Sequence, residues 1–213
     1  MPKQKAKRKT KEFNFLLEEV RRLGAREAKI IGSNKVVVED RVLLKCRTGC
    51  DSYGKKFVCP PYTPTPGEFR KILREYRKVL IVKFPADAEA EEDVGRSLQK
   101  NQCSPAIPPD LRERTNKFWD VWGADKRRIL LAMLELEKAA FNRGFTLAFA
   151  LTAGSCTLCE KCNMDGSCTH PTMARYAEHA LGVNVKKTLM NAGMSIKFPF
   201  EKHPEGLGML LIE

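Results

Sequence analysis

Apolar residues recur along the chain at the spacing of surface helices in some regions and of strands in others. In residues 12–23 the apolar positions fall on one side of a helix, and Gly24 follows as a stop signal. The most regular helical pattern spans residues 125–143 and ends before Gly144, with Met133 in its apolar stripe. Both segments are predicted to be amphipathic helices, and Met133 is assigned to the core.

Strands are predicted where apolar and β-branched residues cluster between turn signals. In chain order, the predicted strands span residues 26–31, 36–38, 42–45, 79–84, 145–151 and 207–212. The run at 145–151 has almost no polar residue, which is typical of a strand buried on both faces of a sheet.

Further helices are predicted between these strands. At one helix start, Thr65 caps the first turn, Pro66 takes the first helical position and Glu68 closes a capping box. The remaining predicted helices span residues 86–101, 110–122, 170–180 and 184–191. The pattern as a whole predicts a single α/β domain over residues 12–213, with a mixed sheet flanked by helices.

Composition agrees with one globular domain. The chain has 213 residues, of which 43% are hydrophobic, enough for a substantial core. It has no run of about 18 apolar residues, and no apolar segment follows the charged N-terminus, so neither a membrane span nor a signal peptide is expected. We therefore expect a cytoplasmic protein with no membrane partner. In that reducing compartment its eight cysteines are poor candidates for structural disulfides.

The net charge of +12 is concentrated at the N-terminus. Residues 1–11 contain six Lys and Arg residues and no acidic residue, which leaves about +6 for the rest of the chain. We expect this segment to be a disordered basic tail. It has two interpretations: a solubilising extension without a dedicated function, or an arm that contacts nucleic acid or an acidic partner.

The strongest chemical signal is a group of four cysteines that follows the predicted strand at 145–151. They are spaced C-x2-C-x2-C-x5-C and comprise Cys156, Cys159, Cys162 and Cys168. We call residues 156–168 the second cysteine segment. Its first three thiols resemble the run that wraps a 4Fe-4S cluster in bacterial ferredoxins, whereas zinc more often takes two distant C-x2-C pairs. The spacing favours iron–sulfur over zinc, and zinc over disulfides.

An earlier group of cysteines follows the predicted short strands. It comprises Cys46, Cys50 and Cys59, and two prolines after Cys59 restrict the backbone. We call residues 46–59 the first cysteine segment. Its spacing matches no general metal-binding rule, so its thiols are either ligands of a second centre or partly buried residues and partly donors to the other centre. Cys103, in a proline-rich loop, is either a fourth ligand or a bystander.

Both cysteine segments are expected to be metal loops at strand ends, where open α/β sheets place their ligands. His170 follows the second segment directly. It is either a ligand, a hydrogen-bond partner of a ligand, or a residue without a role in the site.

The cysteines and their neighbours also carry a resemblance to a known family. It rests on Cys46, Cys50-Asp-Ser-Tyr-Gly, Cys59-Pro-Pro, Gly154-Ser-Cys156, Cys159, Cys162, Cys168-Thr-His-Pro and Leu181-Gly-Val-Asn-Val. The chain resembles prokaryotic proteins described only as predicted metal-binding, over about residues 26–200. The resemblance implies a metal or iron–sulfur centre held by the seven cysteines of the two segments. It implies no particular reaction.

The sequence thus identifies a class of cofactor more closely than a function. The leading hypothesis is an iron–sulfur protein with one or two 4Fe-4S clusters, which transfers electrons or assists a redox partner protein. A second hypothesis is an enzyme whose three-cysteine site leaves one iron open to substrate. A third is a zinc-binding module that contacts nucleic acid through its basic surface.

Overall fold

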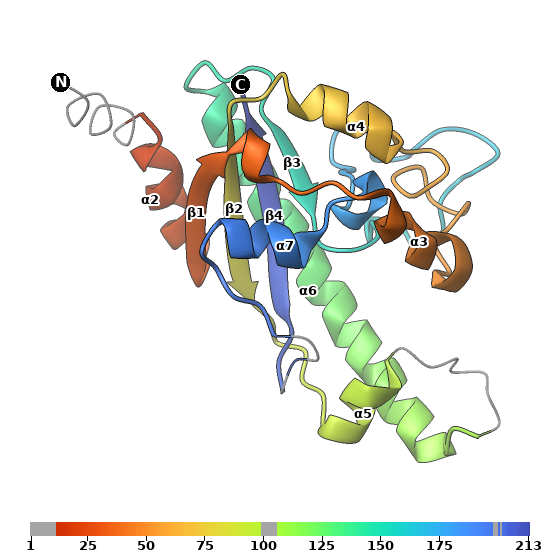
Figure 1. Cartoon of the computed structure of the whole chain (residues 1–213). Coiled ribbons are helices and arrows are strands. Elements are labelled where there is room, and N and C mark those ends of the chain that lie inside the picture. Colours follow the sequence, from red (N-terminus) through yellow and green to blue (C-terminus); the bar gives the residue numbers. More distant parts are fainter. Residues whose placement is uncertain (1–11, 99–105, 198–199, 201) are drawn as a thin grey trace.

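The computed structural model describes residues 12–98, 106–197, 200 and 202–213 (Figure 1). Its centre is a four-stranded sheet in the order β1-β2-β4-β3. The strands are Glu27–Gly32 (β1), Lys78–Pro85 (β2), Phe149–Thr152 (β3) and Glu205–Ile212 (β4). The single α/β domain expected from the sequence is confirmed. The predicted tail at residues 1–11 lies outside the described residues.

The sheet is antiparallel in all three strand pairings, where a mixed sheet was expected. Gly32 at the end of β1 pairs with Lys78 at the start of β2. The connection between these strands therefore leaves and re-enters the sheet at the same end, and this makes the pair antiparallel.

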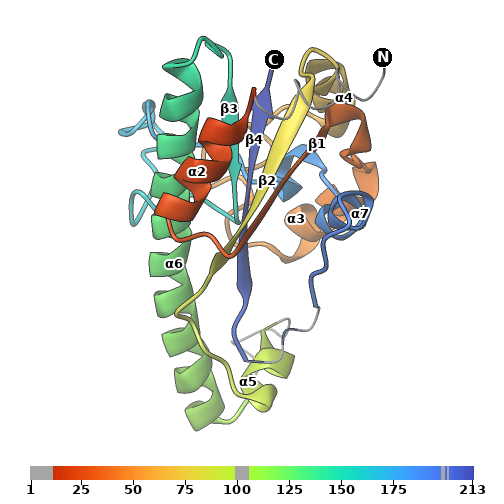
Figure 2. The same cartoon turned by 90° about the vertical axis from the view of Figure 1, so that its left-hand side faces the viewer.

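Helices cover both faces of the sheet, as the edge-on view in Figure 2 shows. One face carries α2 (Asn14–Arg22) and α6 (Pro109–Phe141), and the other carries α4 (Pro66–Leu73) and α7 (Val185–Asn191). Side chains of β2 alternate between the two cores. Leu80 and Val82 pack with α2 and α6, whereas Val79 and Ile81 pack with α4 and α7. This is the alternation that a strand buried on both faces requires.

The long helix α6 approaches β4 closely at two glycines. A Cβ atom on Gly206 would lie 2.0 Å from Cδ1 of Ile129, and one on Gly208 would lie 2.3 Å from Sδ of Met133. Both glycines therefore serve helix–sheet packing. Met133 is fully buried, as predicted.

Several predicted helices are confirmed. α2 occupies the first amphipathic segment, α4 begins with the capping box at Thr65, and α7 begins where the Asn184 side chain accepts a hydrogen bond from the Lys187 amide. The segments expected at 110–122 and 125–143 are one continuous helix, α6. No helix among the described residues is long and apolar enough to cross a membrane.

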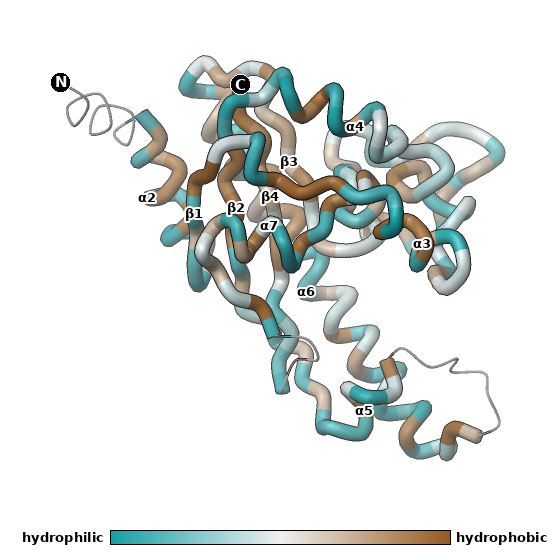
Figure 3. The backbone as a smooth tube through the Cα atoms, in the orientation of Figure 1, coloured by the Kyte–Doolittle hydropathy of each residue, from teal (hydrophilic) through white to brown (hydrophobic). Residues whose placement is uncertain are grey.

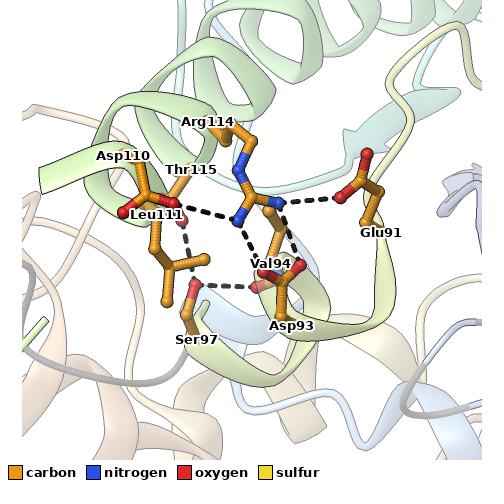
Figure 4. A network of polar contacts seen from close by, with 8 residues as sticks. All are labelled: Glu91, Asp93, Val94, Ser97, Asp110, Leu111, Arg114 and Thr115. Atoms are coloured by element: carbon orange, nitrogen blue, oxygen red, sulfur yellow. Dashed lines mark hydrogen bonds and ion pairs between the residues drawn. The ribbon is translucent and has the colours of Figure 1, made fainter. Parts of the chain in front are cut away.

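A short helix, α5 (Glu92–Ser97), is all that the described residues show of the helix predicted at 86–101. It is fastened to α6 by the polar network in Figure 4. The Arg114 guanidinium lies 2.6 Å from the Asp93 carboxylate and 2.8 Å from Glu91, and the hydroxyls of Ser97 and Thr115 lie 2.9 Å apart beneath it. This network lies at the opposite end of α6 from the cysteine segments (Figure 1).

Three predictions of secondary structure are wrong. Residues 42–45 enter a helix, α3 (Leu43–Gly49), instead of a strand. Residues 36–38 form no named strand, and only Val38 makes an isolated bridge. The helix expected at 170–180 is a series of turns that ends in the 3-10 helix His179–Leu181. In addition, β3 begins only at Phe149, because the residues before it form a turn.

Candidate metal centre

The first cysteine segment lies on a helix and turns, where a loop at a strand end was expected. Cys46 is inside α3, and Cys50 is the residue that ends this helix. The remaining residues form turns, which close where the Gly54 amide donates to the Pro60 carbonyl at 2.9 Å. Gly54 has φ +67°, a backbone conformation that favours glycine at this turn. The segment does not follow a strand end because residues 42–45, which were predicted to be a strand, lead into helix α3.

The second cysteine segment does follow a strand end, as predicted. Thr152 ends β3, and Gly154 turns the chain with φ +68° into a stretch without helix or strand. Figure 3 shows this loop as mainly white and teal, in contrast to the brown stretches of the central strands. The segment is therefore mainly polar, although its Leu158 is buried.

The fold brings the two segments side by side. The Lys56 ammonium, in the first segment, donates a 2.6 Å hydrogen bond to the Cys156 carbonyl, in the second. The Cys59 thiol lies within electrostatic range of Cys50, Cys46 and Cys156. Cys156 thus connects the two groups of thiols, which are about a hundred residues apart in sequence.

The remaining predicted ligands lie along the second segment. Cys156 is also within electrostatic range of Cys162 and Cys159. Cys168, at the far end, is a partly buried free thiol. Cys103 lies outside the described residues.

Burial changes the acidity of three thiols. It raises the pKa of Cys59 to about 12, and the neighbouring Cys50 contributes in the same direction. Burial also raises the pKa of Cys46 and Cys156. These thiols hold their protons at neutral pH until a cation replaces them, so metal binding must release protons.

The seven described thiols are suitable ligands for a soft metal, although no three of them are placed around one point. All seven described cysteines are free thiols. Within residues 12–98, 106–197, 200 and 202–213, no group of three or more His, Cys, Asp or Glu residues is placed to hold a metal ion. Thiolates select zinc, Cu(I) and iron–sulfur clusters. The chemistry of the donors therefore fits such a centre.

His170 contacts a candidate ligand. Its Nδ1 atom lies 3.2 Å from Sγ of Cys159. The Thr169 hydroxyl lies 3.1 Å from the same sulfur and 3.0 Å from Nδ1 of His170. Of the interpretations open from the sequence, this contact favours a hydrogen-bond partner of a ligand. Thr169 is a further member of this group that sequence reasoning did not identify.

Two lysines near the thiols were also missed. Lys56 lies in the first segment, and Lys126 projects from α6, where its Cδ atom is 3.2 Å from the position of a Cβ on Gly154. Burial lowers the pKa of Lys126, and the nearby Lys56 lowers it further. The position of Lys56 among the cysteines was a usable signal. Lys126 offered none, since its proximity arises only from the tertiary fold.

An ion pair attaches the chain beyond the second segment to the core. The Arg175 guanidinium lies 2.5 Å from Oε1 of Glu137 on α6, and the pair is largely shielded from solvent. Oε2 of Glu137 also accepts a 2.7 Å hydrogen bond from the Ala150 amide of β3. Glu137 therefore joins α6, β3 and the segment that returns from the cysteines.

Comparison with known proteins agrees with the chemistry of these thiols. The family described as "Predicted metal-binding protein (DUF2284)" matches residues 29–212, which include both cysteine segments. Searches of curated proteins and of solved structures found no match. The match covers most of the chain, and the chain belongs to this family of predicted metal-binding proteins.

Proposed function

We propose that the protein binds iron–sulfur through its two cysteine segments and transfers electrons to or from a partner protein. The observation that carries this proposal is the hydrogen bond from Lys56 to the Cys156 carbonyl, which brings the two cysteine segments together. Cys59 and Cys156 are close enough for their charges to interact. Seven thiols on two adjoining segments suit a sulfur-ligated centre. The C-x2-C-x2-C spacing supports a cubane cluster over zinc.

The proposed ligands are those expected from the sequence. Cys156, Cys159, Cys162 and Cys168 supply four thiolates, which suffice for one closed 4Fe-4S cluster. Cys46, Cys50 and Cys59 supply three more, and the nearest described thiol of the other segment is Cys156. A bound cluster would supply reversible one-electron chemistry, while the thiols of both segments orient it.

Metal and sulfide analysis tests the proposal. Protein purified without oxygen should be brown and contain iron together with acid-labile sulfide. Cys168→Ala should lower the iron content, because it removes one of the four thiolates of the second segment. Cys103→Ala is the matched control and should leave the iron content unchanged. Colourless protein that holds stoichiometric zinc and cannot be reconstituted with iron and sulfide would overturn the iron–sulfur assignment.

A second candidate is an enzyme with an open iron at the first segment. A shallow, open depression of about 620 Å³ lies on the chain just after Cys59 and is lined by Pro61, Tyr62 and Ile72 among others. The described residues that line it include no cysteine, so it supports a small-molecule site near the first segment only through its place in the chain. An iron that lacks a protein thiolate can accept substrate as a Lewis acid.

A small exogenous ligand separates the two candidates. Cyanide or a small thiol should perturb the spectrum of an open iron and leave a fully ligated cluster unchanged. A perturbation that persists in Cys168→Ala and disappears in Cys59→Ala would place the open iron at the first segment. An unperturbed spectrum would favour the electron carrier.

A further inference from the structure

Lys56 and Lys126 are two cations beside the start of the second cysteine segment: Lys56 Nζ lies 2.6 Å from the Cys156 carbonyl oxygen, and Lys126 Cδ lies 3.2 Å from the position of a Cβ on Gly154. Lys126 lies within electrostatic range of Lys56, Cys50 and Cys59. Lys56 in turn lies within range of Cys59 and Cys156. The two ammonium groups come from different elements, one from the first cysteine segment and one from α6, so the tertiary fold brings them together.

Neither lysine has an acidic partner in the part of the chain that the structure describes. The ion pairs there do not include Lys56 or Lys126, and the only hydrogen bond made by the Lys56 ammonium among these residues is to the Cys156 carbonyl. Both side chains are partly shielded from water. Two like charges at such a place repel each other and lose hydration, which is unfavourable unless an anion is also present.

A thiolate-bound metal centre has the charge that would compensate this pair. Four thiolates with one Zn²⁺, or with an oxidised 4Fe-4S core, carry a net charge of roughly −2. A neutral thiol contributes no such charge. The positive charge of the two lysines should therefore stabilise the metal-loaded state of the cysteines and destabilise the metal-free state.

We infer that Lys56 and Lys126 are positioning residues that neutralise the dianionic metal–thiolate centre and so favour metal binding by the two cysteine segments. This inference rests on the proposed binding of metal but holds for iron–sulfur and for zinc. Lys56 also ties the segments together through the Cys156 carbonyl, and Lys126 packs its aliphatic chain against Gly154.

The test uses the full-length protein with Lys56→Met, Lys126→Met and the double substitution. Methionine keeps much of the aliphatic stem and removes the charge. Lys55→Met and Arg127→Met are matched controls, since each removes an exposed cation next in sequence to the residue in question. Each protein is prepared without metal and then loaded with zinc alone or, without oxygen, with iron and sulfide.

The inference predicts opposite effects on the two states. Without metal, Lys126→Met should melt at the same temperature as the wild type or higher, because it removes a repulsion and keeps the hydrogen bond from Lys56 to the Cys156 carbonyl. The double variant also loses that hydrogen bond, so its metal-free melting temperature is compared with that of Lys56→Met. The metal affinity of the double variant, measured by competition with a chelator, should fall by about 10- to 100-fold. Any iron–sulfur cluster should have a more negative midpoint potential, since the reduced centre loses two compensating cations. The control variants should match the wild type in all three measurements.

The measurements distinguish failure of the proposed metal binding from failure of the role given to the two lysines. Wild-type protein that takes up neither zinc nor iron would overturn the proposed function and this inference with it. Normal metal binding with unchanged affinity and potential in the double variant would overturn only the inference. Inorganic phosphate that raises the melting temperature of the metal-free wild type, but not of the double variant, would show that the lysines hold a separate anion and would also overturn it.

Discussion

The central strands and the cysteine segments are stabilised in different ways. β2 and β4 pair along eight residues each, and nearly all of their side chains are buried. The cysteine segments contain one short helix and otherwise turns, and a lysine–carbonyl hydrogen bond connects them. Apolar burial specifies the strands without any ligand. The cysteine segments bury fewer side chains, so we expect their arrangement to depend on what the thiols bind.

Global stability and metal binding should therefore depend on different residues of this chain. A substitution in the strands should alter unfolding and leave the thiol chemistry of the folded protein intact. A substitution in the cysteine segments should alter metal binding and have little effect on the metal-free core.

The largest effect is expected at the contact between α6 and β4. Met133→Ala should lower the free energy of unfolding by about 2–5 kcal/mol, because it empties a fully buried site. Gly208→Ala alone should cost about 1–3 kcal/mol by overpacking, since its Cβ would lie 2.3 Å from Sδ of Met133.

In the double variant the two costs should not add, because the smaller residue at position 133 leaves room for the new methyl group. Gly123→Ala, in the open on α6, is the control and should not destabilise the protein. Denaturant unfolding of the metal-free proteins measures all four. Additive costs would show that the close approach of Gly208 and Met133 does not matter.

The next largest effect is expected at the ion pair between Glu137 on α6 and Arg175 beyond the second cysteine segment. Glu137→Ala removes the partner of both Arg175 and the Ala150 amide, and should lower the free energy of unfolding by about 3 kcal/mol. Glu135→Ala, two residues earlier on the same helix, loses only an exposed contact with Lys138 and should cost less than about 1 kcal/mol. Equal losses in chemical denaturation would contradict the role given to Glu137.

A buried carboxyl should make stability depend on pH. Burial raises the pKa of Glu178 from its ordinary value of 4.5 to about 8, and its Oε1 atom has no hydrogen-bond partner in the described structure. The folded protein therefore keeps a proton that the unfolded chain releases above pH 4.5.

The contribution of Glu178 to the free energy of unfolding should consequently fall as the pH rises from about 4.5 to about 8, with a slope of up to about 1.4 kcal/mol per pH unit. Burial lowers the pKa of the adjacent His179 from 6.5, which gives the opposite slope below that pH, so the total should fall most clearly between about pH 6.5 and 8. Glu178→Gln should remove the Glu178 contribution, and urea titrations of both proteins at several pH values would show it. A difference between the two profiles that does not change with pH would contradict the assignment.

The smallest effect is expected at the start of α4. The Thr65 hydroxyl accepts from the Glu68 amide and the Glu68 carboxylate accepts from the Thr65 amide, so Thr65→Ala breaks one half of a capping box. The expected loss is about 1 kcal/mol. Thr48→Ala, whose hydroxyl donates to the Leu44 carbonyl in α3, removes no cap and should be closer to neutral. Thermal unfolding distinguishes the two.

The parts of the fold that the sequence predicted are those with strong local signals. The stripe of α2 and the capping residues Thr65 and Glu68 depend on neighbours within a few positions, and these predictions are confirmed. Residues 42–45 were too short a run to separate helix from strand. Tertiary packing decides whether these residues form a helix or a strand, and it buries Leu43 and leaves Leu44 57% exposed.

The candidate site was partly predictable for the same reason. Cysteine spacing predicted the candidate donors, but it did not show that Cys59 and Cys156 would lie within electrostatic range of each other. Nor did any local pattern mark Lys126 or the contact of Arg175 with Glu137, which form only when α6 docks on the sheet. That contact also explains the wrong helix at 170–180, because Arg175 is held by α6 and the Tyr176 carbonyl accepts from the Thr152 amide.

Hydrogen exchange with and without metal tests most directly whether a metal centre organises the two cysteine segments. After anaerobic loading, amides in residues 46–59 and 156–170 should exchange much more slowly than in the metal-free protein, whereas amides of β2 and β4 should be unchanged. Loaded protein in which the cysteine segments exchange as fast as in the metal-free form would contradict the account.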